Sequence, residues 1–249
     1  MSPASGSDAS LLAAPPLRNI QWRHATRIVR SIYPPIELFE DIADPADWEP
    51  IASAEAKTNP RVRDQIGQIA LVPPERRVSG PGASWVMAPF TQVSKDRPTR
   101  FSAGDFGVYY CGNRFEVALA ETIFHFERFM SATRQPPATA DFRELIGSAR
   151  LRAHDLRGDA RFSDCLDPDD YRAGQALGAK LRAAGSDGFV YPSVRYPKGH
   201  ALAVFWPDRV SIPRQGRHLC YRWNGAACDA YLVYGDADAW TPWQWDAVR

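Results

Sequence analysis

Polar and apolar residues alternate along residues 21–33, QWRHATRIVRSIY, and this pattern predicts a strand near the start of the chain. Arg27 shares a face of that strand with Ala25 and Val29, so a charged side chain lies among apolar neighbours. Residues 1–18 are rich in Ser, Ala and Pro and predict a disordered tail ahead of the strand.

The following stretch predicts two helices and then a loop. Asp44 and Pro45 offer an N-cap and a first helical residue, and a second short helix is expected after Asn59 and Pro60. Residues 73–100 contain many Pro and Gly residues and predict a long loop. Long ordered loops often cover functional sites, so this segment is expected to border one.

A strand-to-helix unit comes next, with a strand over residues 106–111 and a helix over residues 114–130. Asn113 and Glu116 have the spacing of a capping box at the start of that helix. Glu121 lies on the apolar side of the helix, where an ionised carboxylate is costly unless it is paired or used. Either this helix face lines a cleft, or Glu121 pairs structurally with an arginine of the core.

The second half of the chain predicts a longer strand region, one helix and several short strands. The strand region covers residues 142–156 with a break near Gly147. A helix is expected to start at Asp167 and Pro168 and to end at Gly185. Leu145, Leu151 and Leu156 are the expected inward residues of this strand region. Short strands are expected over residues 188–194 and 201–207, and two more within residues 217–234.

Composition and charge narrow the class of protein. The 249 residues, 45% hydrophobic and 24% charged, suit one α+β domain over residues 19–249, with mixed or antiparallel sheets flanked by helices. A formal net charge of +1 gives no reason to expect direct nucleic-acid or membrane binding. The chain has no long apolar run and no basic n-region of a signal peptide, and its four cysteines predict buried reduced thiols in a cytoplasmic protein.

Glu121 has neighbours that suit a catalytic site. His125 lies one helical turn further along the same face, and Tyr110 is near the end of the preceding strand, on the face opposite to Tyr109. A tyrosine at a strand end and an inward carboxylate form a plausible wall of a pocket. The spacing alone leaves open a structural role for Glu121 and a partly exposed His125.

Further candidates lie elsewhere in the chain. Arg27 and Arg100 have the side chain that binds phosphate or carboxylate in a bidentate manner, although either could lie on the sheet surface. Ser193 follows a buried strand, as a binding hydroxyl or a simple turn residue, and Gln175 lies on the inner face of its helix. The five histidines are scattered, so no metal site is expected, and glycine-rich phosphate loops and a nucleophile elbow are absent.

Three blocks of the sequence together resemble the RES domain, a toxin family named for an arginine, a glutamate and a serine. TRIVRS (26–31) is similar to the arginine strand of the family. Residues 100–129 resemble its tyrosine strand and glutamate helix, in which an eleven-residue step to the glutamate selects Tyr110 over Tyr109. Residues 170–195 resemble its closing block, which contains Gln175 and Ser193.

The resemblance spans roughly residues 21–210, with residues 40–99 longer than in compact members of the family. It implies a fold similar to that of diphtheria-toxin-like ADP-ribosyltransferases and a toxin that cleaves the nicotinamide–ribose bond of NAD by hydrolysis or phosphorolysis. It also implies a helix-turn-helix (Xre-like) antitoxin that occludes the site. A protein ADP-ribosyltransferase on the same scaffold and a non-catalytic binding module are the alternatives.

The resemblance also implies a role for each candidate residue. Glu121 would stabilise the positive charge of the ribosyl transition state, and Arg27, helped by Arg100, would hold the pyrophosphate. Tyr110 would stack on nicotinamide or form a wall of the pocket, and Ser193 would bond to a phosphate or ribose oxygen. Weaker ligand-binding roles would fall to Gln175 and His125.

Overall fold

The computed structural model describes residues 13–32, 46, 48, 67–236 and 239–248, and their strands form one eight-stranded sheet. The strands are β1 (Leu17–Arg30), β2 (Tyr109–Gly112), β3 (Ala138–Asp155), β4 (Gly188–Pro192), β5 (His200–Val204), β6 (Arg214–Trp223), β7 (Cys228–Val233) and β8 (Trp240–Pro242). Their order is β1–β2–β5–β4–β3–β6–β7–β8, and β1 also pairs with β3. The first five strands in this order therefore close a circuit, and β6, β7 and β8 extend from β3.

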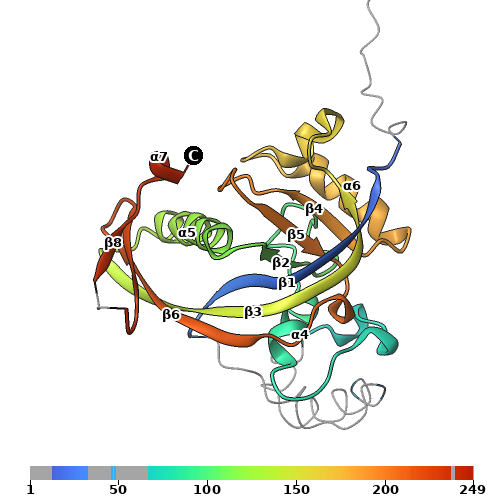
Figure 1. Cartoon of the computed structure of the whole chain (residues 1–249), viewed down its shortest axis with the longest axis horizontal. Helices are drawn as coiled ribbons and strands as arrows, with labels where there is room; N and C mark the ends of the chain where they lie inside the picture. Colours follow the sequence, from blue (N-terminus) through green and yellow to red (C-terminus); the bar gives the residue numbers. More distant parts are fainter. Residues whose placement is uncertain (1–12, 33–45, 47, 49–66, 237–238, 249) are drawn as a thin grey trace, which may run out of the picture.

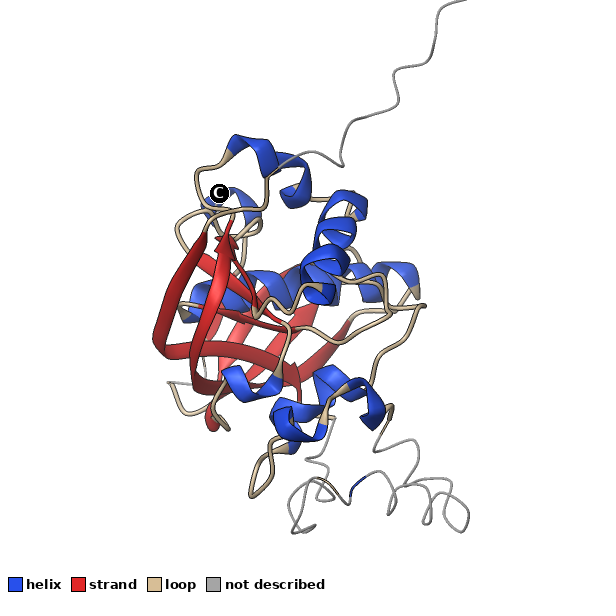
Figure 2. Cartoon of the chain, turned by 90° about the vertical axis from the view of Figure 1, so that its right-hand side faces the viewer, coloured by secondary structure: helices blue, strands red, loops and turns tan. Residues whose placement is uncertain are grey.

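Helices cover both sides of these strands (Figure 2). The helices are α4 (Ser84–Thr91), α5 (Phe115–Ala132), α6 (Arg172–Ala183) and α7 (Trp245–Val248), with short 3-10 helices η1 (Ile69–Leu71), η2 (Pro74–Arg76), η3 (Ala160–Leu166) and η4 (Pro207–Arg209). Figure 1 shows α5 above the long strands β1, β3 and β6, α4 below them, and α6 beside β4. Only β3 and β4 pair in parallel among the described strand pairs, so the expected single domain with a mixed sheet flanked by helices is confirmed.

Each helix buries its apolar side in a separate part of the core. On α4, Met87 and Phe90 are buried against β1, β2 and β3. The apolar side of α5 packs on β3 and β6, where the rings of Phe142 and Tyr221 stack with centroids 4.1 Å apart. A third cluster joins α6 to β2, β4 and β5 through Phe101 and other buried residues. The helices are thus fixed by side-chain burial, the main source of helix stability in proteins.

β1 is central to the site because it pairs with two strands. Its residues pair with β3 along nearly its whole length, with Arg27 opposite Leu145, and Thr26 also pairs with Gly112 of β2. The strand starts at Leu17 and ends at Arg30, so the predicted start at residue 21 was late and the last two residues of the predicted tail belong to the strand. The preceding Pro15 carbonyl accepts a hydrogen bond from Nδ1 of buried His154 at 2.6 Å.

Two expectations from local sequence signals were wrong. The predicted loop over residues 73–100 contains α4, even though Pro89 lies inside that helix. Burial of Val86, Met87 and Phe90 compensates for the backbone hydrogen bond that a proline cannot donate. The expected break near Gly147 is absent, because β3 continues through that residue and pairs with β1 on both sides of it.

Two of the predicted helix starts were also displaced. Helix α5 begins after Arg114, which has no side-chain cap, and Asn113 Oδ1 instead accepts the His200 backbone N–H at 2.9 Å. Helix α6 begins at Arg172, whereas Asp167 accepts the N–H groups of the two aspartates that follow Pro168. In each case a polar side chain that could cap the helix bonds to another backbone group.

Other expectations hold within the described residues. Gly185, with φ +79°, follows α6 and donates its N–H to the Arg182 carbonyl, as expected of a helix end. The inward leucines of β3 and its continuation are buried at 1–5% exposure, and the four cysteines are buried free thiols. Apart from Ala46 and buried Trp48, the helices expected after Asp44 and Asn59 fall outside the described residues. Among the described helices, none is long and apolar enough to cross a membrane.

Candidate functional site

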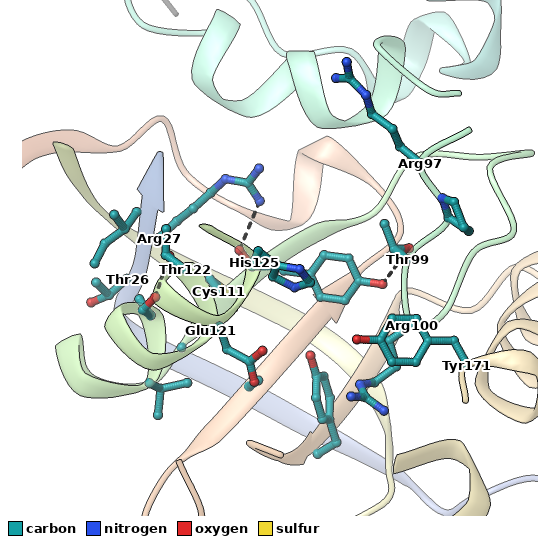
Figure 3. A pocket seen from close by; sticks show the side chains of 18 residues that line it. Thr26, Arg27, Arg97, Thr99, Arg100, Cys111, Glu121, Thr122, His125 and Tyr171 are labelled. Atoms are coloured by element: carbon teal, nitrogen blue, oxygen red, sulfur yellow. Dashed lines mark hydrogen bonds between the residues drawn. The ribbon is translucent and has the colours of Figure 1, made fainter. Parts of the chain in front are cut away.

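A cavity of about 400 Å³ lies where β1, β2, β4, α5 and the segment 97–100 meet. In Figure 3, Glu121 and His125 on α5 lie on one side and Thr99 and Arg100 lie on the other. The arrangement gives the cavity a carboxylate wall and cationic groups from two other elements. Within the described part of the chain, no group of three or more His, Cys, Asp or Glu side chains is placed to hold a metal ion.

Glu121 is the only acidic residue among the side chains that line this cavity. Its Oε1 accepts a hydrogen bond from the Ser193 hydroxyl at 3.0 Å. Burial raises the pKa of Glu121 above its ordinary value of 4.5, while the Ser193 hydrogen bond, the charges of Arg100 and Arg195, and the Arg195 N–H oppose that rise. The surroundings of the carboxylate therefore disfavour its ionisation. Among the described residues, no Lys, Arg or His forms a salt bridge with Glu121.

Ser193 lies behind Glu121 as seen from the cavity. It follows β4 directly, is only 2% exposed and is absent from the cavity wall. Its hydroxyl oxygen accepts the Tyr196 N–H at 3.1 Å, which leaves the hydroxyl proton directed to Glu121. The structure thus brings Ser193 to the site as a support of the carboxylate, whereas the sequence resemblance implied a direct bond to the ligand.

Arg27 reaches the cavity from the middle of β1. Its Nη1 donates to the Tyr110 carbonyl at 3.1 Å, and its guanidinium lies 4.8 Å from the centroid of the Tyr109 ring. Among the described residues no carboxylate pairs with Arg27, which lines the cavity with a side chain that can bind an anion in a bidentate manner.

Tyr110 is at once a wall of the cavity and a support for the segment opposite α5. Its hydroxyl donates to Thr99 Oγ1 at 2.9 Å and accepts the Phe101 N–H at 3.1 Å. Gln175 of α6 lies outside the cavity wall and donates from Nε2 to the Thr99 carbonyl at 3.0 Å. The structure therefore joins these two predicted residues to one segment, but it gives Gln175 no direct contact with the cavity.

Arg100 is fixed by backbone carbonyls. Its Nη1 donates to the Asp167 carbonyl at 2.5 Å and the Cys165 carbonyl at 3.4 Å, and its guanidinium lies 4.6 Å from the Tyr171 ring centroid. The side chain is only 8% exposed, yet it lines the cavity. Its positive charge consequently acts on the cavity from a fixed position. Arg97 lies at the exposed rim, where its guanidinium points away from Glu121 (Figure 3).

His125 lies on the cavity wall one turn after Glu121, as expected, but its side chain is exposed at the rim. The surrounding protein atoms and the charges of Arg128, Arg195 and Arg100 lower the pKa of His125 to about 4. His125 is therefore neutral near pH 7 and adds no charge to the rim.

Sequence reasoning missed two residues that shape the site. Tyr191 of β4 lines the cavity, and Thr99 carries the hydrogen bonds of both Tyr110 and Gln175. Tyr191 could have been found because it precedes Ser193 by two residues and so lies on the same face of the strand. Thr99 gave no such signal, because its importance arises from contacts with residues far away in the sequence.

The fold is that of a single-domain α/β protein, with a carboxylate and arginines around one cavity. Residues 74–224 match the RES domain, and the chain belongs to that family. It is 25% identical over 211 residues to the "Uncharacterized protein y4oC" of Sinorhizobium fredii (strain NBRC 101917 / NGR234), covering 85% of this chain and 87% of that protein. It also resembles a chain in the crystal structure of the M. tuberculosis MbcT–MbcA toxin–antitoxin complex, with 12% identity, a TM-score of 0.42 and coverage of 84% and 88%.

Proposed function

We propose that this protein cleaves the bond between nicotinamide and ribose in NAD and acts as the toxin of a toxin–antitoxin pair. The observation that carries the proposal is the Glu121 carboxylate, which lines a cavity opposite Arg100, with Arg27 in another part of the same wall (Figure 3). NAD combines a cationic nicotinamide ring with an anionic pyrophosphate. A cavity with one carboxylate and separate arginines suits both parts of such a ligand.

The proposed reaction starts with the departure of nicotinamide. The bond between ribose C1′ and the ring nitrogen breaks, and its electron pair goes to that nitrogen, so the cationic ring leaves as a neutral molecule without a general acid. An acceptor oxygen from water or phosphate forms the new bond to C1′, and a proton from water passes to the solvent. The transition state resembles an oxocarbenium ion, whose charge Glu121 stabilises.

Glu121 has to be ionised for this role. Burial favours its protonated form, while the Ser193 hydroxyl and the Arg195 N–H favour the ionised form. Ser193 therefore acts as a positioning residue that keeps one carboxylate oxygen in place and supports the charge. A preorganised electrostatic contact of this kind contributes about 10²–10³ to a rate.

The arginines bind the other part of NAD in this proposal. Arg27 has N–H groups without a described partner on the cavity side, so it is the main pyrophosphate ligand. Arg100 adds a fixed positive charge, because its Nη1 is already held by backbone carbonyls. Tyr110 forms the wall between them and offers its ring, rather than its hydroxyl, to the ligand.

The reaction is tested by incubating the purified protein with NAD in the presence and absence of phosphate. Wild-type protein should release nicotinamide, and the Glu121→Gln variant should be about 10²–10³-fold slower. Glu116→Gln makes the same chemical change on an exposed residue of α5 and should leave the rate unchanged.

The products separate the proposal from its alternatives. Free ADP-ribose indicates hydrolysis and ADP-ribose-1″-phosphate indicates phosphorolysis, whereas ADP-ribose attached to a macromolecule indicates a protein ADP-ribosyltransferase. Absence of nicotinamide release by a folded wild-type protein supports a non-catalytic binding module and contradicts the proposal.

The toxin role needs a test in cells. Expression of the wild-type protein should deplete NAD and stop growth, and expression of Glu121→Gln should do neither. We propose a small helix-turn-helix (Xre-like) protein as the antitoxin, so co-expression of such a protein from a neighbouring gene should restore growth. Growth arrest that is equally strong with Glu121→Gln would contradict the proposed toxic activity.

A further inference from the structure

Tyr191 lines the cavity with a hydroxyl that none of the described residues bonds. Its side chain is 4% exposed, and its ring packs edge-on against Phe101 with centroids 5.2 Å apart. The residue also lines the cavity. Among the described residues no hydrogen-bond partner exists for the Tyr191 hydroxyl, whereas the neighbouring Tyr110 hydroxyl has both Thr99 and Phe101 as partners.

A ligand that fills the cavity would take this hydroxyl out of water, and that costs free energy unless the ligand supplies a hydrogen bond. The side chain stands at the cavity, so a ligand can supply the missing bond. Tyr191 and Ser193 are two residues apart at the end of β4 and project to the same side, and Ser193 bonds to Glu121. The same strand end therefore brings one hydroxyl to the carboxylate and another to the cavity beside it.

We propose that the Tyr191 hydroxyl binds a ribose hydroxyl of the substrate, next to the carbon atom whose charge Glu121 stabilises. The inference rests on the proposed cleavage of NAD and adds a specificity residue to it. The 2′- and 3′-hydroxyls lie on the same sugar ring as the reacting carbon, and the Tyr191 hydroxyl is close enough to Glu121 for the two groups to interact electrostatically. The ligand class is thus a ribonucleotide that the protein recognises by a hydroxyl of its ribose.

The ionisation of Tyr191 supports a donor role. Burial and the Glu121 charge raise its pKa well above the ordinary value of 10, so the hydroxyl keeps its proton at any physiological pH. A site that hydrogen-bonds a substrate hydroxyl disfavours analogues without it, because the protein group then stays buried and unpaired. Tyr191 is accordingly expected to select ribose over deoxyribose.

The test compares three substrates: NAD, and two analogues whose nicotinamide-side ribose lacks either the 2′- or the 3′-hydroxyl. We measure kcat/KM from nicotinamide release for wild type and Tyr191→Phe, after correction for the uncatalysed rate of each compound. Tyr191→Phe should lower kcat/KM for NAD about tenfold and leave it unchanged for the analogue that lacks the contacted hydroxyl. With wild type, that analogue should itself react about tenfold less efficiently than NAD, and this measurement does not depend on the stability of a variant.

Tyr231→Phe is the matched control. Tyr231 is a tyrosine of β7 that faces Trp243 away from the cavity, so its variant should behave as wild type on all three substrates. Phenylalanine keeps the ring that packs on Phe101, so Tyr191→Phe should retain the wild-type melting temperature.

The possible results separate the two proposals. An equal effect of Tyr191→Phe on all three substrates, or no effect on NAD, overturns the role of Tyr191 and leaves NAD cleavage standing. A wild-type protein that releases no nicotinamide overturns both.

Discussion

Two glutamates on α5 differ in what they contact, since one lines the cavity and the other links the helix to distant elements of the fold. Glu121 faces the cavity and accepts one side-chain hydrogen bond, from Ser193. Glu127, less than two turns later, accepts the Cys228 N–H through Oε1 and the Trp245 Nε1–H through Oε2, each at 2.9 Å. Glu127 therefore attaches α5 to β7 and α7, and both of its carboxylate oxygens are used by the protein.

The two carboxylates differ in how many hydrogen bonds they accept from the protein. Both carboxylate oxygens of Glu127 accept hydrogen bonds from the protein, whereas half-buried Glu121 accepts one side-chain hydrogen bond and has a raised pKa. Functional groups are often held in unfavourable surroundings that the rest of the fold supports. The comparison teaches that the bonding of an inward carboxylate, rather than its presence on an apolar helix face, distinguishes a site from a structural link.

Replacing each glutamate in turn by glutamine is the strongest test of whether the two residues have different roles. Glu121→Gln should lower the rate of nicotinamide release by about 10²–10³-fold, because the amide cannot stabilise a cationic transition state. Glu127→Gln should change the rate less than about twofold, since the residue is absent from the cavity wall. Comparable losses of rate in both variants would contradict the division of roles.

Truncating Glu127 should reveal its structural role. Glu127→Ala leaves the Cys228 N–H and the Trp245 indole N–H without their acceptor, and should lower the free energy of unfolding by about 1–3 kcal/mol. Denaturant unfolding followed by tryptophan fluorescence measures this change, with exposed Glu116→Ala as the control. An unchanged free energy would show that the link between α5 and α7 contributes nothing.

Removing the support of Glu121 should sharpen the pH dependence of the reaction. The Ser193 hydrogen bond lowers the pKa of Glu121, so Ser193→Ala should raise that pKa further. Activity requires the ionised form and is lost as pH falls through this pKa, so the acidic limb of the kcat profile should move to higher pH. The rate near neutral pH should fall about tenfold. A Ser193→Ala variant with lower activity but an unmoved acidic limb would argue against this role of Ser193.

The smallest expected effect concerns stability. Glu121 has a folded-state pKa above its ordinary 4.5, so it favours the folded state at low pH and this contribution is lost as pH rises through the folded-state pKa. Glu121→Gln should therefore match wild type below about pH 4.5 and melt at a higher temperature near neutral pH. Thermal melts across this range check the sign, and a lower melting temperature of the variant near pH 7 would indicate that Glu121 stabilises the fold.

Much of the frame of the site could be predicted from the sequence. The apolar stripe of α5 and the alternation in β2 place Glu121 and Tyr110 correctly on the cavity, because both patterns extend over enough residues to define a face. Arg27 was identified from its place in β1, between apolar neighbours. The positions of these residues could be predicted because each follows from the periodicity of a single helix or strand, which is visible in the local sequence.

Features that depend on distant partners could not be predicted. The hydroxyl of Ser193 points to Glu121 because Tyr196 and β4 orient it, and Gln175 is drawn to Thr99 by the packing of α6. Helix α4 was missed because Pro89 is a strong local signal against a helix, which burial of its neighbours overrides. The direction of a polar side chain depends on contacts with residues far away in the sequence, and the local sequence pattern does not reveal these contacts.

The closed circuit of strands has a consequence for the order of synthesis. Arg27 lies on the first strand, its contact with Tyr110 spans 83 positions, and Ser193 joins Glu121 across 72. β1 cannot complete its pairing until β3 has left the ribosome, and Glu121 has no hydroxyl partner until Ser193 follows β4. Contacts of such long range form late and slowly. The residues that we propose for catalysis are thus not brought together in the nascent chain until β4 has been synthesised.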